Sequence, residues 1–383
     1  MDFSLSDEQE SFLEQVTAFV RDRVAPEAAR IDESGAFPRE LVSEAATLSL
    51  TGLTIQKEFG GGGHDTVTYA MAMEAVSFGS ATLAVILSVN NSLVAEPIRD
   101  HGTAEQKDRW LRPLATGRAI GAFALSEANA GSDAANQLTT ARPDAGGYVL
   151  RGTKVWVANA EAADVAIVFA RSEPGSTRSR GISAFLVPLD LPGIRRRASD
   201  SLGVRGLGCM DLTFEDVRLD AAARLGGAGR GFAVAMKALE GGRIAIAAQA
   251  LGVGRAALGE AIAYARSREV FGQPLGEFQA VQFQLADLAT DLSAARVLTW
   301  RAASLRPFVG RVAAEAAMAK LHASEAAHRA ADRAMQILAS EGYRRGSTIE
   351  RLFRDVRAAE IYQGTSEVQR MIIAEHLLET RAD

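Results

Sequence analysis

The order of sequence patterns along the chain constrains its fold most strongly. Between residues 119 and 225, short runs of β-branched and aromatic residues are separated by glycine and proline clusters, which is typical of a β-domain. The flanking segments, 1–118 and 226–383, carry apolar residues at helical spacing. We therefore expect an α+β protein with an N-terminal helical domain (1–118), a middle β-domain (119–225) and a C-terminal helical bundle (226–383).

Charge and cysteine content narrow the classes of function. The 383 residues are 48% hydrophobic, which is typical of a globular protein. Their net charge of −5 gives no indication of binding to a nucleic acid. A single cysteine, Cys209, excludes an intrachain disulfide framework and a cysteine-rich metal site. The N-terminus lacks a signal-peptide pattern, and polar residues interrupt the apolar stretch Ala75–Ala95. We expect a cytoplasmic protein with no metal site and no membrane contact.

Four spaced motifs carry a specific resemblance, which covers the whole chain. Each is weak alone, but together and in this order they closely resemble the acyl-CoA dehydrogenases, flavoenzymes that desaturate acyl thioesters. The resemblance implies the acyl-CoA dehydrogenase fold, with a four-helix bundle as its C-terminal domain. The motifs are Phe123–Glu127 followed by Gly131–Asp133, Arg268–Gly272, Phe278–Gln282 and Ile361–Arg370.

The resemblance also implies a non-covalently bound FAD. A flavin needs fixed hydrogen-bond donors where negative charge develops on reduction, and the strand edge at 123–126 is expected to face its pyrimidine ring. Trp156 is expected to cover the flavin, with core packing as the alternative. Arg268 is expected to bind the pyrophosphate of a neighbouring subunit's FAD, with helix-surface polarity as the alternative, so a homotetramer is implied. The positions that match cofactor contacts of the family are Phe123, Leu125, Ser126, Ser132, Trp156, Ala158, Arg268, Phe271, Gln279, Gln336, Thr365 and Glu367.

The catalytic position departs from the family pattern. Gln363 stands where most members carry the glutamate that removes the α-proton of the substrate, and an amide cannot act as that base. The backbone N–H of residue 363, which in the family donates to the thioester carbonyl, survives the change. Some members place the base before the arginine of a Glu-Arg pair, but here that pair is Gly242-Arg243. Ala158 also replaces a hydroxyl residue near the flavin.

Two other acids are weighed as substitutes. Glu96 shares a helical face with Val89 and Leu93, so it could recognise a polar acyl group or act as a relocated base. The alternative, which we favour, places Glu96 in solvent at a helix end before Pro97. Glu240 is a weaker candidate and is expected to be a solvated helix acid.

Four functions remain open at this point. The first is oxidation of an acyl thioester, bound to CoA or to an acyl carrier protein, with an electron-transfer flavoprotein or oxygen as the acceptor. The second is flavin-dependent oxygenation or a non-redox rearrangement of a thioester. The third is an enoyl-thioester reductase, and the fourth is a catalytically silent flavin-binding partner subunit. Both the flavin and the thioester determinants are present, so an FAD-dependent oxidoreductase is expected first.

Overall fold

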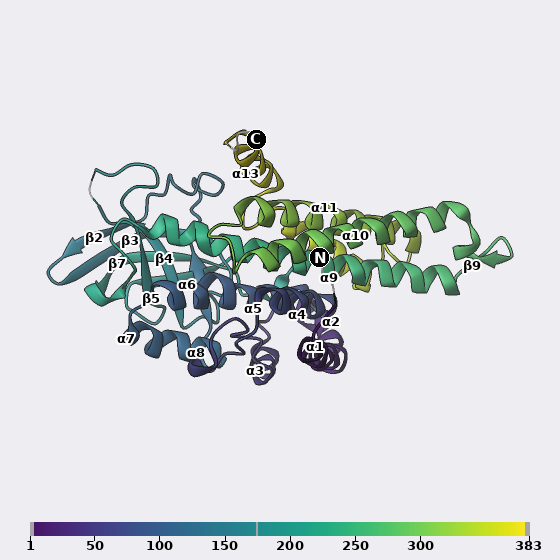
Figure 1. The fold of residues 1–383 in the computed structure, drawn as a ribbon, viewed down its shortest axis with the longest axis horizontal. Helices are drawn as coiled ribbons and strands as arrows, with labels where there is room; N and C mark the ends of the chain where they lie inside the picture. The colour runs from purple at the N-terminus through teal and green to yellow at the C-terminus, as the bar shows by residue number, and fades with distance from the viewer. Residues whose placement is uncertain (1–3, 174, 380–383) are drawn as a thin grey trace.

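A computed structural model describes residues 4–173 and 175–379. The molecule is elongated: a β-sheet lies at one end, and long helices run from it along the molecule to a small hairpin at the other end (Figure 1). The N-terminal helices line one side of this axis. The order helical, β, helical is the one that the sequence patterns predict.

The N-terminal region is helical, with three π-helical segments at Val20–Val24, Val89–Ala95 and Lys107–Leu111. Its first helix begins at a capping box in which the Ser6 hydroxyl accepts from the Gln9 N–H and the Gln9 side chain accepts in return. The α-helices are α1 (Asp7–Phe19), α2 (Ala25–Ser34), α3 (Arg39–Thr47), α4 (Thr66–Gly79), α5 (Ala81–Ser88), α6 (Glu96–His101), α7 (Ala104–Gln106) and α8 (Arg112–Ala115).

The helical stretch Ala81–His101 joins α5 and α6 through a π-helical segment. It has the length and apolar character of a membrane span, but its most apolar window is entirely buried inside the protein. Such burial is what a core helix of a globular protein shows. The stretch therefore forms part of the core against which the rest of the chain packs.

The middle region folds into an eight-stranded sheet. Its order is β6-β7-β3-β2-β4-β5-β8, and β1 pairs in parallel with β4. The neighbouring strands β4 and β5 are almost wholly buried, which explains their continuous apolar sequence. The strands are β1 (Gly121–Ala124), β2 (Thr140–Asp144), β3 (Gly147–Val157), β4 (Val165–Arg171), β5 (Ile182–Pro188), β6 (Ile194–Ala198), β7 (Met210–Asp220) and β8 (Arg224–Leu225).

The C-terminal region is a bundle of long helices rich in alanine and glycine. Small residues let α9 approach its neighbours closely: a Cβ at Gly252 would fall 2.3 Å from the Glu74 carbonyl oxygen of α4. A two-stranded hairpin (β9, Glu269–Val270; β10, Gln273–Pro274) separates the first two helices. The helices are α9 (Gly231–Ser267), α10 (Gln279–Leu305), α11 (Ala313–Leu338), α12 (Thr348–Arg357) and α13 (Ser366–Glu379).

Candidate active site

The turn before α13 holds Gln363 where three elements meet. Gln363 has a φ of 54°, a left-handed conformation that is uncommon for a residue other than glycine. Its side chain lies against α9, because a Cβ at Gly242 would fall 2.1 Å from Gln363 Oε1. The same Cβ would fall 3.0 Å from Leu93 Cδ2. The turn, α9 and the buried helix 81–101 therefore converge on Gln363.

Gln363 has unused hydrogen-bonding groups. Its Oε1 is buried and has no hydrogen-bond partner. Its backbone N–H also makes no hydrogen bond to any residue that the structure describes. Buried polar groups in folded proteins are nearly always paired, so the unpaired Oε1 of Gln363 indicates a place for a ligand, and the free N–H lies on the same residue.

The next peptide is held by two side chains from different helices. Lys320 Nζ of α11 and Gln369 Nε2 of α13 each donate to the Gly364 carbonyl oxygen at 2.7 Å. Lys320 is fully buried. Burial, together with the nearby Arg243 charge, lowers the pKa of Lys320 to about 7. The strained turn is thus fixed by a lysine that folding places in an apolar surrounding.

Arg243, next to Gly242 on α9, is also buried. It is only 6% exposed, and its guanidinium makes no hydrogen bond within residues 4–173 and 175–379. Burial lowers the pKa of Arg243, and the charge of Glu240 opposes that effect. Two cations therefore lie close together beside the turn at Gln363, and neither has a carboxylate in direct contact.

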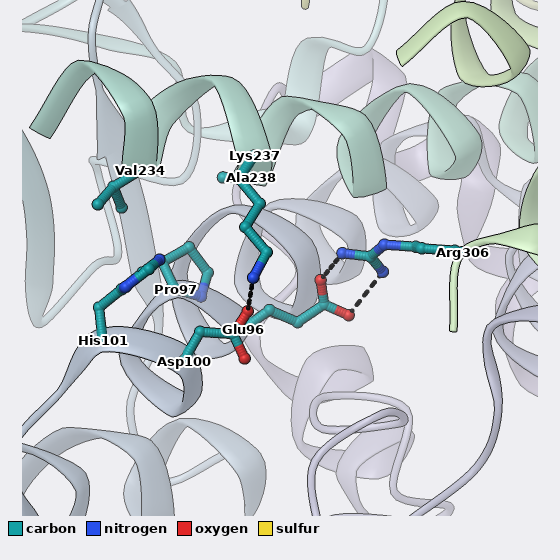
Figure 2. Close-up of a pocket in the computed structure, with 8 residues that line it drawn as sticks. All are labelled: Glu96, Pro97, Asp100, His101, Val234, Lys237, Ala238 and Arg306. Atoms are coloured by element: carbon teal, nitrogen blue, oxygen red, sulfur yellow. Dashed lines mark hydrogen bonds and ion pairs between the residues drawn. The ribbon is translucent and has the colours of Figure 1, made fainter. Parts of the chain in front are cut away.

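The expectation that Glu96 lies in solvent is wrong. The Glu96 side chain is buried and paired with Arg306, whose Nη2 and Nη1 atoms lie 2.5 and 3.1 Å from its two oxygens (Figure 2). The Thr54 hydroxyl donates to it at 2.7 Å. Burial opposes ionisation, but Arg306 holds the pKa of Glu96 below its usual value. A carboxylate so fully engaged is a poor base and has little capacity left to recognise a polar acyl group.

The space beside this ion pair is too small for a substrate. A cavity of about 10 Å³ borders Glu96 and Arg306, and Asp100 there pairs with Lys237 at 3.2 Å (Figure 2). Such a volume holds about one water molecule. Arg306 reaches Glu96 because the chain has glycine at 241, where a Cβ would fall 2.6 Å from Arg306 Nη2. The pair is therefore a structural support behind the turn.

Glu240 does not lie in solvent either. It is 6% exposed, accepts from the Val312 N–H at 3.3 Å, and lies 3.5 Å from Arg311. Both partners precede α11. Glu240 therefore ties the loop between α10 and α11 to α9, and no atom of the turn at Gln363 is among its bonded partners.

In the middle region, the side chain expected to cover the flavin, Trp156, is exposed. Trp156 has a φ of 55° and is 59% exposed, although the next residue of its strand, Val157, is buried. The strand edge lies beside it, since the Val155 N–H donates to the Ser126 carbonyl at 2.9 Å. Core packing, the alternative for Trp156, does not describe an indole with this exposure.

A buried ion pair fixes the strand edge. Lys154 Nζ donates to the Leu125 carbonyl at 3.0 Å and to Glu127 Oε1 at 2.8 Å. Glu127 in turn accepts from the N–H groups of Leu138 and Thr139. Burial lowers the pKa of Lys154 to about 8, and Glu127 opposes that effect. The network holds the backbone of 125–127 rigid.

The other predicted cofactor contacts of the middle region and of the turn before α13 differ in how far they are buried. Phe123 and Ala158 are half-buried, and Ser132 is exposed in a turn. The Thr365 hydroxyl accepts from the Val368 N–H at 3.4 Å, which begins α13, and Glu367 is exposed in its first turn. None of these positions contradicts a cofactor contact, and none requires one.

The remaining predicted contacts lie at the far end of the molecule. Phe271 is 98% exposed at the hairpin of β9 and β10, the end of the long axis opposite the sheet (Figure 1). Arg268 precedes that hairpin, and Gln279 begins α10 after a short 3-10 helix (Leu275–Glu277) that follows it. Gln336 is exposed near the end of α11. One chain therefore does not bring this group to Trp156.

The sequence patterns did not predict three features of the site: the buried residues Lys154 and Lys320, and the absence of a hydrogen-bond partner for Arg243 among the described residues. One signal was present. Lys320 lies on a face of α11 that is otherwise built of buried alanines, such as Ala316 and Ala323. A lone lysine on an apolar helix face indicates a buried partner, here the Gly364 carbonyl.

Comparison with known proteins agrees with this architecture. Family models match three consecutive regions: the acyl-CoA dehydrogenase N-terminal domain at 6–118, the middle domain at 122–217 and the C-terminal domain at 229–378. The human mitochondrial short-chain specific acyl-CoA dehydrogenase is 46% identical over 375 residues, which cover 98% of this chain and 91% of that protein.

Solved structures extend the likeness to three dimensions. The butyryl-CoA dehydrogenase of Megasphaera elsdenii superposes with a TM-score of 0.96 at 38% identity, covering 99% of this chain and 100% of that one. A chain from a study of the electron transferring flavoprotein of Acidaminococcus fermentans has a TM-score of 0.97 at 37% identity, covering 99% and 100%. The chain therefore belongs to the acyl-CoA dehydrogenase family of FAD-dependent oxidoreductases.

Proposed function

We propose that this protein binds a short acyl-CoA thioester at the turn of Gln363 and acts on it with FAD, by a reaction that does not use residue 363 as the base. The unpaired Gln363 N–H carries the proposal. It lies in a turn fixed by Lys320 and Gln369, so it is available to donate to the thioester carbonyl. The short acyl chain is proposed by analogy with the short-chain and butyryl-CoA dehydrogenases.

The residues present fit FAD. The exposed indole of Trp156 and the backbone at 125–127, held by Lys154, offer a flat apolar face and an adjoining polar edge. Arg268, Phe271, Gln279 and Gln336 lie too far along the molecule to reach the same cofactor, so a second subunit supplies them. FAD supplies a hydride acceptor when bound. We propose a homotetramer, with an electron-transferring flavoprotein as the acceptor.

Gln363 limits the chemistry of this chain. Its amide cannot take a proton from the α-carbon, and loss of a general base costs about 10²–10⁴-fold in rate. The substitutes considered from sequence are engaged elsewhere, because Glu96 binds Arg306 and Glu240 binds the loop before α11. The chain itself orients the thioester and polarises its carbonyl, but neither of the two substitute acids, Glu96 and Glu240, reaches the turn as a base.

Anaerobic mixing of the FAD-loaded protein with butyryl-CoA tests the proposal. We expect binding that perturbs the flavin absorbance, with bleaching slower by about 10²-fold or more than in the variant Gln363→Glu. Gln363→Leu, of similar size but without a carboxylate, is the control and should not bleach faster than the natural protein. Absence of any spectral change with butyryl-CoA would contradict the proposed substrate. Equal rates for Gln363→Glu and Gln363→Leu would show that the pocket is altered beyond this residue.

A further inference from the structure

The turn at Gln363 lies beside two buried basic groups, Arg243 and Lys320, and neither forms an ion pair with a carboxylate among the residues described. Arg243 is 6% exposed and makes no hydrogen bond to the residues described. Lys320 is fully buried, and its one hydrogen bond is to a neutral carbonyl, that of Gly364. The two charges are close enough to repel each other. An unpaired buried charge is costly, so this arrangement needs a counter-ion.

Most of the acids around these cations are engaged with other groups, and one is exposed at the surface. Glu240 binds the Val312 N–H and lies beside Arg311, and Glu96 is bound to Arg306. Glu360 is shared by His328 and Arg357. Glu325 pairs with Arg370. Glu367 is exposed. The residue placed between the turn and α9 is Gln363, which is neutral.

We propose that the substrate brings the missing carboxylate, attached to its α-carbon, so that the protein takes a malonyl-type (2-carboxyacyl) thioester. This inference rests on the proposed function, in which residue 363 faces the α-carbon. Arg243, whose buried Nε has no hydrogen-bond partner among the residues described, is the group that binds this carboxylate. The neutral amide of Gln363 tolerates an anion beside it, whereas a glutamate there would repel one.

Such a substrate removes the need for a base. The bond between the α-carbon and the carboxylate carbon breaks, carbon dioxide leaves, and the electron pair stays on the α-carbon as an enolate. The negative charge moves to the thioester oxygen, where the Gln363 N–H donates. The enolate then takes a proton from solvent. It is the same species that proton abstraction from a plain acyl thioester would form.

Malonyl-CoA and isovaleryl-CoA form a matched pair of probes. They have the same branching, with two carboxylate oxygens in one and two methyl groups in the other, and the same CoA charge. Titration calorimetry with the FAD-loaded full-length protein should show malonyl-CoA binding about ten- to a hundredfold more tightly. Malonyl-CoA has no β-hydrogen, so its conversion to acetyl-CoA, followed by chromatography, should proceed without any change of flavin redox state.

Variants at the cations test their role. Arg243→Gln should lower malonyl-CoA affinity more than isovaleryl-CoA affinity, so that the preference is lost, and Arg243→Lys, which keeps the charge but not the planar guanidinium, should retain part of the preference. Lys320→Met provides a second test if Arg243→Gln does not fold. Lys57→Met, an exposed lysine of the N-terminal region, serves as the control and should leave both affinities unchanged.

The outcomes separate this inference from the function on which it rests. Equal affinities for the two thioesters, or malonyl-CoA recovered intact after prolonged incubation, would overturn the inference and leave the proposed acyl-CoA site standing. Failure of both thioesters to bind the FAD-loaded protein would overturn the proposed function and the inference together.

Discussion

At the residue scale, Lys320 makes stability depend on pH. Its pKa is about 7 in the folded protein and 10.5 in an exposed lysine, because burial disfavours the charged form. Between these values the unfolded chain holds more protons than the folded one, so the free energy of unfolding rises with pH across that window. Below about pH 7 both states are protonated and Lys320 contributes no slope.

Lys320→Met should remove this contribution. Urea unfolding at pH 6.5, 8 and 9.5 should show a smaller rise of unfolding free energy with pH in Lys320→Met than in the natural protein. Lys57→Met, whose side chain is exposed, should keep the natural slope. Parallel curves for all three proteins would show that Lys320 stays protonated in the folded state.

Glu96 tests a buried ion pair. Glu96→Gln keeps the size of the side chain but leaves Arg306 buried without its counter-ion, at an expected cost of about 3–5 kcal/mol. The exposed pair of Glu341 and Arg344 provides the comparison, and Glu341→Gln should cost less than about 1 kcal/mol. Chemical denaturation measures both. A Glu96→Gln protein as stable as the natural one, with altered acyl-CoA selectivity, would return Glu96 to the substrate site.

At the element scale, α9 is shaped to admit the Gln363 turn. Gly242→Ala should displace the Gln363 amide, because the new Cβ would fall 2.1 Å from Oε1. We expect acyl-CoA affinity to fall by about tenfold or more while the FAD content is retained. Gly259 lies on the same helix with open space around it, so Gly259→Ala should raise stability by about 1 kcal/mol and leave affinity unchanged. Unchanged affinity in Gly242→Ala would show that the turn moves without loss.

At the scale of the whole molecule, the proposed FAD contacts in the sheet and those around the β9–β10 hairpin lie at opposite ends of one chain (Figure 1). A complete site therefore needs a second copy. Arg268→Glu combined with Phe271→Ala should lower the FAD-to-protein absorbance ratio while each chain stays folded, because both side chains are exposed in the single chain. Light scattering of the natural protein should report a tetramer. A monomer with a full complement of FAD would contradict this arrangement.

Local patterns in the sequence were enough to predict the secondary-structure elements and the family. The short apolar runs at Val165–Phe169 and 182–187 became β4 and β5, and the apolar stretch before Pro97 became part of the buried helix. The identity of residue 363 and the motif around it could also be read directly. These features depend on neighbouring residues, which the sequence shows without knowledge of the fold.

The sequence by itself determined the order of elements, the family and the loss of the glutamate at 363. Only the tertiary structure decided which charges are buried and with what partners. Glu96 meets Arg306 across 210 positions of the chain, and Lys320 meets the Gly364 carbonyl across 44. The free energy of a charged group depends on burial and on the groups that surround it, and segments distant in sequence supply both. For this reason the position of Glu96 at a helix end suggested that its side chain is solvent-exposed. For the same reason, the unpaired basic groups beside Gln363 became apparent only in the tertiary structure.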